Sequence, residues 1–185
     1  MTHGIRFLQE NPEINEVLEK LYLKRELDQW YIEKSKQPIV MPEDILNIQE
    51  IIEVKVQDRF NPSAYVYMKL QEHRGEGGFI LLQEMQLTIS KIVPVYQYLL
   101  YHRIKHDSLQ GFLGLVGSAD TFEFMEVEAK VNKIFQQSGF IKLSHEYDAY
   151  DTVYEWSHLE NIDPVNRRLT LKDAVFVDIL ELCND

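Results

Sequence analysis

Between residues 50 and 104 the chain carries four successive segments of β-strand composition, and short turns join them. The four segments are residues 50–59, 64–71, 79–89 and 93–104. The first alternates apolar and polar residues, and the others are rich in Tyr, Val, Ile and Leu, as strands commonly are. Turn-forming residues separate the first three, at 61–63 and at 74–78. Because strands joined by short turns pair antiparallel, the pattern predicts a meander.

Helical periodicity precedes this region. Asn11 and Pro12 are suited to a helix start, and Pro38 ends any helix that begins there. The apolar residues of this segment fall on two opposite sides of a helix, at Ile14, Val17, Leu18 and Leu21 on one side and at Leu23, Leu27 and Trp30 on the other. We therefore expect either a helix that breaks near Lys24-Arg25 or a continuous helix packed on two sides.

The second half predicts a helix over residues 121–137, with Asp120 as its cap and Glu123 in capping-box register. A glycine-spaced loop at residues 110–118 is expected to lead into it, with its glycines at positive φ. Short strands are predicted at 140–144 and 152–156, and a last helix at 171–182. A short helical turn is expected at 42–47, before the first strand.

These elements predict an α+β fold. We expect a mostly antiparallel sheet of about five to six strands, with an N-terminal long helix or helix pair and one to two further helices packed on it. Residues 1–185 contain no internal repeat and no linker-like tract, so a single domain is predicted, with residues 1–38 as a candidate helical appendage.

The chain carries a net charge of −11, and its basic residues are scattered. That charge opposes binding to nucleic acid and to anionic lipid. No signal peptide pattern and no apolar run long enough for a membrane span is present in the sequence. The single cysteine, Cys183, cannot form an internal disulfide, which is consistent with a reducing compartment. We therefore expect a cytoplasmic protein.

Catalytic and cofactor motifs are missing from the sequence, so we favour a non-enzymatic role and expect no cofactor. His102 and His106 stand four apart, but a strand would separate them by about 13 Å, too far for one metal ion. Gly111, Gly114 and Gly117 match no nucleotide-binding spacing, and a connecting loop is the simpler interpretation.

One acidic, aromatic stretch, residues 143–166, is unusual because it contains no Lys or Arg. Tyrosine and tryptophan are common at binding hot spots, and carboxylates around them attract a basic partner. The candidate interaction residues are Tyr147, Asp148, Tyr150, Asp151, Tyr154, Glu155 and Trp156. The competing interpretation is a strand whose aromatics enter the core while its acids face solvent.

The leading functional hypothesis is a protein-binding module that presents this stretch to a basic protein, as an acidic inhibitor or neutralising partner. Bacterial immunity proteins against nuclease toxins offer an analogy of charge, not of sequence.

Three alternatives stay open. A small-molecule enzyme or ligand-binding domain would have a pocket between sheet and helices, with strand tyrosines such as Tyr65, Tyr67, Tyr96, Tyr98 and Tyr101 lining it. A metal site would use His145, Asp148, Asp151 and His158. A subunit of a larger assembly would expose one apolar face of the first helix.

Overall fold

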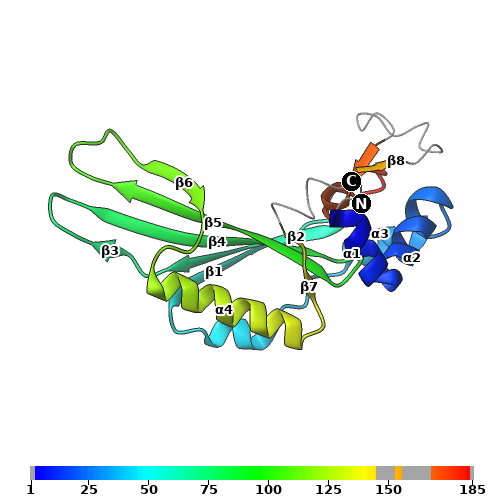
Figure 1. Ribbon diagram of the computed structural model, residues 1–185, viewed down its shortest axis with the longest axis horizontal. Coiled ribbons are helices and arrows are strands. Elements are labelled where there is room, and N and C mark those ends of the chain that lie inside the picture. Colours follow the sequence, from blue (N-terminus) through cyan, green and yellow to red (C-terminus); the bar gives the residue numbers. More distant parts are fainter. Residues whose placement is uncertain (1–2, 145–152, 156–167, 184–185) are drawn as a thin grey trace.

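The computed structural model describes residues 3–144, 153–155 and 168–183, and it has an α+β architecture (Figure 1). The helices are α1 (His3–Glu10), α2 (Pro12–Leu18), the π-helical turn η1 (Glu19–Leu23), α3 (Asp28–Lys36), the 3-10 turn η2 (Glu43–Asn47), α4 (Phe122–Gln137) and α5 (Leu171–Phe176). The strands are β1 (Ile51–Gln57), β2 (Ser63–Leu70), β3 (His73–Arg74), β4 (Ile80–Ser90), β5 (Val95–Lys105), β6 (Leu113–Gly117), β7 (Ile141–Lys142), β8 (Val153–Glu155) and β9 (Arg168–Thr170).

The main sheet follows the predicted meander. Its strand order is β1-β2-β4-β5-β6, with every neighbouring pair antiparallel. β3 adds to β4, and β7 adds to β5 as a parallel pair. Figure 1 shows that β3 and β6 lie at the opposite end of the molecule from the N-terminal helices. The long β4–β5 hairpin connects these two ends.

Helix α4 covers one face of the sheet, which we call the α4 face (Figure 1). The apolar side chains of alternate strand positions, such as Val66 and Leu87, form a core with Phe124 and Phe135 of the helix. This alternation arises because successive strand residues point to opposite faces of a sheet. The predicted helix at 121–137 is therefore confirmed, and Gly139 ends it at a φ of +81°.

The cap of α4 lies one residue later than predicted. Thr121, not Asp120, is the N-cap, and its hydroxyl accepts a hydrogen bond from the backbone N–H of Phe124 (3.2 Å). The Asp120 carboxylate instead accepts a hydrogen bond from the Gln83 side chain (3.0 Å), so it is directed to the sheet and not to the helix start.

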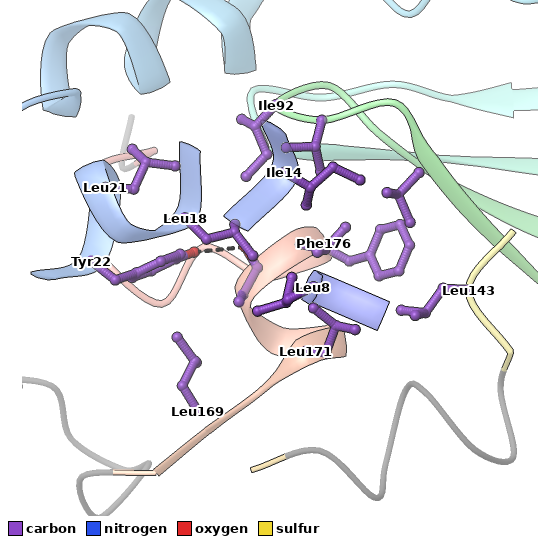
Figure 2. Close-up of a cluster of buried hydrophobic side chains, with 14 of the residues drawn as sticks. Leu8, Ile14, Leu18, Leu21, Tyr22, Ile92, Leu143, Leu169, Leu171 and Phe176 are labelled. Carbon is purple, nitrogen blue, oxygen red and sulfur yellow. Dashed lines mark hydrogen bonds between the residues drawn. The ribbon is translucent and has the colours of Figure 1, made fainter. Parts of the chain in front are cut away.

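A second core lies at the helical end of the molecule, where α1, α2 and η1 pack against α5 and the β4–β5 turn (Figure 2). Leu18 and Leu171 are fully buried in it, at 0% exposure. The Tyr22 hydroxyl donates to the carbonyl of Ala174 (2.9 Å), and the Ser90 hydroxyl donates to that of Val175 (2.9 Å). The N-terminal helices therefore share one core with the C-terminal segment.

The N-terminal helical segment breaks near Lys24-Arg25, which is the first of the two predicted alternatives. Arg25 adopts a φ of +56°, and α3 begins three residues later at Asp28. A right-handed helix needs a negative φ at every residue, so the positive φ of Arg25 interrupts the helix. Both apolar sides of the segment are buried or partly buried in the second core, which covers the surface suggested above for a larger assembly.

The last helix is shorter than predicted. Thr170 caps α5 as expected, because its hydroxyl accepts from the N–H of Asp173 (3.1 Å). The helix ends at Phe176, and Val177 is extended. The Asp178 carboxylate then accepts hydrogen bonds from the N–H groups of Leu182 (3.2 Å) and Cys183 (2.8 Å). These contacts hold the chain after Phe176 in a turn.

The predicted glycine loop at 110–118 is the clearest error, because residues 113–117 form strand β6. Of its three glycines only Gly111 has a positive φ, whereas Gly114 and Gly117 take part in strand pairing. Within the described residues, no helix is long and apolar enough to cross a membrane.

Candidate interaction surface

Strand β6 forms one edge of the main sheet. It pairs with β5 from Leu113 opposite Ile104 to Gly117 opposite Leu100. In the part of the chain that the structure describes, no strand pairs with its other side. Backbone N–H and C=O groups on that side are therefore free to bind another strand.

The side chains of β6 are apolar and exposed on both faces of the sheet. Leu113 and Leu115 are 50% and 48% exposed, and their pairing with Ile104 and with the buried His102 places them on the α4 face. Val116, on the opposite face, is 59% exposed. If one face of β6 were packed against the protein, every second residue would be buried. All residues of β6 are exposed instead.

Helix α4 extends this apolar surface on its own face of the sheet. Phe122 and Met125, in its first turns, are 72% and 52% exposed. Met125 lies one helical turn before Glu128, whose carboxylate accepts a hydrogen bond from Tyr98 of β5 (2.5 Å). The flank of α4 that carries Met125 is therefore the one directed toward β5 and β6.

We call the combined surface the β6 patch. Its members are Leu109, Phe112, Leu113, Leu115, Val116, Phe122 and Met125, all at least 42% exposed. Between Asp107 and Asp120 the sequence contains no Asp, Glu, Lys, Arg or His. Large exposed apolar surfaces on a folded protein commonly mark a contact with another molecule.

A buried polar network fixes the connection between β6 and α4. The His102 ring is 5% exposed, and its Nε2 lies 3.1 Å from the carbonyl oxygen of Ser118, just after β6. Since a carbonyl only accepts, Nε2 carries the proton. Its Nδ1 then faces the side-chain nitrogen of Gln83 at 3.4 Å.

Gln83 joins this network to the helix cap. Its amide oxygen accepts from the Thr121 hydroxyl (2.9 Å), and its amide nitrogen donates to Asp120 (3.0 Å). The Thr121 hydroxyl oxygen in turn caps α4. Three elements, β4, β5 and the start of α4, therefore converge on one buried amide, and the apolar residues on either side of it are held in place.

His102 and His106, weighed above as a metal pair, have separate partners. His102 belongs to the buried network, whereas the Nδ1 of His106 lies 2.7 Å from the Ser108 hydroxyl. No group of three or more metal-ligating side chains occurs among residues 3–144 and the other described ranges.

The candidate tyrosines lie on two faces of the sheet, so they cannot line one cavity. Tyr96 and Tyr98 are buried beneath α4, and Tyr65, Tyr67 and Tyr101 are on the opposite face. Burial raises the pKa of Tyr96 to about 12. Tyr98 also binds the amine of Lys142, whose pKa is lowered by burial.

The acidic, aromatic stretch can be placed only in part. Tyr154 and Glu155 belong to β8, and they pair with Leu169 and Arg168 of β9. The other candidate interaction residues, Tyr147, Asp148, Tyr150, Asp151 and Trp156, lie outside the described residues, as do the metal candidates His145, Asp148, Asp151 and His158. The short strand predicted at 152–156 is confirmed.

Sequence reasoning missed the β6 patch. Comparison with known protein families, curated proteins and solved structures finds no match to this chain. The geometry of its own surface must therefore suggest its function.

Proposed function

We propose that this chain is a protein-binding module that binds by strand addition at β6. A single observation carries the proposal: an edge strand that is apolar, uncharged and exposed on both faces. In strand addition, a partner strand pairs with the free backbone groups of a sheet edge, and its alternate side chains supply specificity.

The chemistry of the patch defines the partner segment that fits. It is an extended segment with apolar side chains on both faces, because Leu115 on one face and Val116 on the other are both exposed and lose contact with water only beside apolar neighbours. Met125 of α4, on the flank that faces β5, would contact the same partner on the α4 face.

A finer form of this proposal concerns the acidic, aromatic stretch at residues 143–166. The net charge of −11 supports binding to a basic protein, in the manner of an acidic inhibitor or immunity-type partner. This second contact would weaken as salt screens the charges, whereas an apolar strand contact would not.

Affinity capture from native lysate tests the strand-addition proposal with two matched variants as bait. Val116→Lys puts a charge on the β6 edge, and Val56→Lys makes the same change on the other edge, where Val56 is 48% exposed. We expect wild type and Val56→Lys to retain a stoichiometric partner that Val116→Lys loses. Equal capture by all three baits would contradict the proposal.

The acidic contact is tested separately by replacing Tyr150, Asp151 and Trp156 with alanine. We expect a basic partner to be captured at low salt, released at high salt, and lost with the triple variant. If the triple variant and wild type capture the same proteins at every salt concentration, the acidic stretch is not the contact.

A further inference from the structure

We propose that the strand which adds to β6 is β6 of a second copy of this chain, in an antiparallel pair related by a two-fold axis. This inference rests on the strand-addition function proposed above and names its partner. The resulting dimer would continue the sheet from one copy into the other, with both α4 helices on the same face.

The distribution of charge favours self-pairing at this edge. Each copy carries a net charge of −11, so two copies repel over most of their surfaces. The segment between Asp107 and Asp120 is free of charge, and an antiparallel pair of these segments brings no like charges face to face. The β6 edge is therefore a place where two copies can meet without burying a charge.

The sequence of β6 also selects a register. A two-fold axis through Gly114 places Leu113 opposite Leu115 of the other copy, and Phe112 opposite Val116. An axis through Leu115 would instead place Leu113 opposite Gly117 and Gly114 opposite Val116. The first register pairs every large side chain with another large one, so it buries more apolar surface.

Gly114, at the centre of this register, has open space around it in the single chain. A Cβ atom built on it would meet no atom within 4 Å, and its φ is not positive, so a side chain is accommodated there without strain. This property makes Gly114 a suitable position for probes, because a substitution there does not disturb the packing of the single chain.

The first test measures the mass of the protein by sedimentation velocity over a concentration series reaching several hundred micromolar. We expect wild type and Val56→Lys to reach twice the chain mass of 21.9 kDa, and Val116→Lys and Gly114→Lys to stay at that mass. A wild-type protein that is monomeric throughout the series would overturn self-pairing. Circular dichroism melting curves confirm that each variant is folded, and Gly114→Lys keeps the test valid should Val116→Lys fail to fold.

The second test traps the register. In a Cys183→Ser background, Gly114→Cys places two thiols directly opposite each other, and antiparallel pairs separate their Cα atoms by roughly 4.5–5.5 Å, within disulfide range. We expect mild oxidation to convert most of the protein to a covalent dimer, with Val56→Cys as the control that stays monomeric. A monomeric Gly114→Cys protein under the same conditions would rule out this register.

The native thiol interferes little with that measurement. Burial raises the pKa of Cys183 to about 11, so less of this thiol is the reactive thiolate at neutral pH than for an ordinary thiol. We therefore expect the wild-type protein to give no covalent dimer. Gly114→Cys should give the same covalent dimer with or without the Cys183→Ser change.

The dimer should also depend on salt. Screening weakens the repulsion between two acidic copies, so the dimer should strengthen as NaCl rises.

The capture experiment distinguishes a failure of self-pairing from a failure of the proposed function. A monomeric wild type whose β6 edge still captures another protein, and loses it with Val116→Lys, would overturn self-pairing and leave strand addition intact. If Val116→Lys retains both the dimer and the captured protein, self-pairing and strand addition are both overturned.

Discussion

The two edges of the main sheet differ in whether they carry features that prevent pairing with another chain. At β1, Glu53 and Lys55 form an ion pair (2.8 Å), and the pairing with β2 is irregular between Ile51 and Glu53. Charges and bulges are common means of preventing an edge strand from pairing with other chains. Strand β6 has neither feature.

The comparison shows that exposure of apolar residues does not by itself distinguish the two edges. Ile52 and Val56 of β1 are 55% and 48% exposed, similar to the leucines of β6. What differs is the presence of charged residues between them, because a partner strand on β1 would have to desolvate Glu53 and Lys55. Strand β6 imposes no such cost.

The largest effect on stability is expected where the core beneath α4 is weakened, and it should differ between the buried Phe124 and the half-buried Val54 of β1. Phe124→Ala removes a fully buried ring that contacts His102 edge-on, and we expect it to lower the free energy of unfolding by about 3–5 kcal/mol. Val54→Ala, at a half-buried position of β1, should cost about 1 kcal/mol. Urea denaturation at one protein concentration measures both, and equal losses would contradict the asymmetry.

A smaller effect is expected from the buried network beside β6. Gln83→Ala leaves Thr121 and Asp120 without their amide partner, and we expect a loss of about 2 kcal/mol. Hydrogen exchange should become faster in β6 and the first turn of α4, while β1 stays unchanged. Gln86→Ala, on the opposite face of the same strand, is the matched control, and a similar exchange pattern in it would argue against a local role for Gln83.

The smallest effect on stability, and the sharpest test of the comparison, comes from making β1 resemble β6. The double change Glu53→Thr and Lys55→Val removes an exposed ion pair, so the midpoint of urea denaturation should change little. With both edges open, however, the protein should form species larger than a dimer in sedimentation velocity. An unchanged size distribution would show that charge does not protect β1.

The sequence predicts the meander well because its signals are local. The turns at 61–63 and 74–78 and the alternation within each strand need no knowledge of the rest of the chain. The helix at 121–137 follows from the spacing of its buried residues, among them Phe124 and Val131. The sequence predicts Asp120 as its cap, because it does not reveal that Gln83 binds this carboxylate.

Strand β6 could not be recognised in the same way. Gly114 and Gly117 resemble loop residues in isolation, and only pairing with the long β5 strand keeps them extended. The sequence carries one indication of a strand here. The residues around those glycines, Leu113, Leu115 and Val116, are apolar, and no charged residue lies among them. The function suggested by the acidic, aromatic stretch stays a prediction, since most of its residues lie outside the described ranges.

The core at the helical end has a consequence for synthesis on the ribosome. Tyr22 and Ala174, whose hydrogen bond joins α5 to the N-terminal helices, are 152 residues apart in the chain. Leu18 and Leu21 therefore lack the part of their core that α5 supplies until this helix has been translated. The meander pairs neighbouring segments and can form as it emerges. This protein should accordingly fold from its middle, and nascent chains stalled before residue 170 should be the species that chaperones bind.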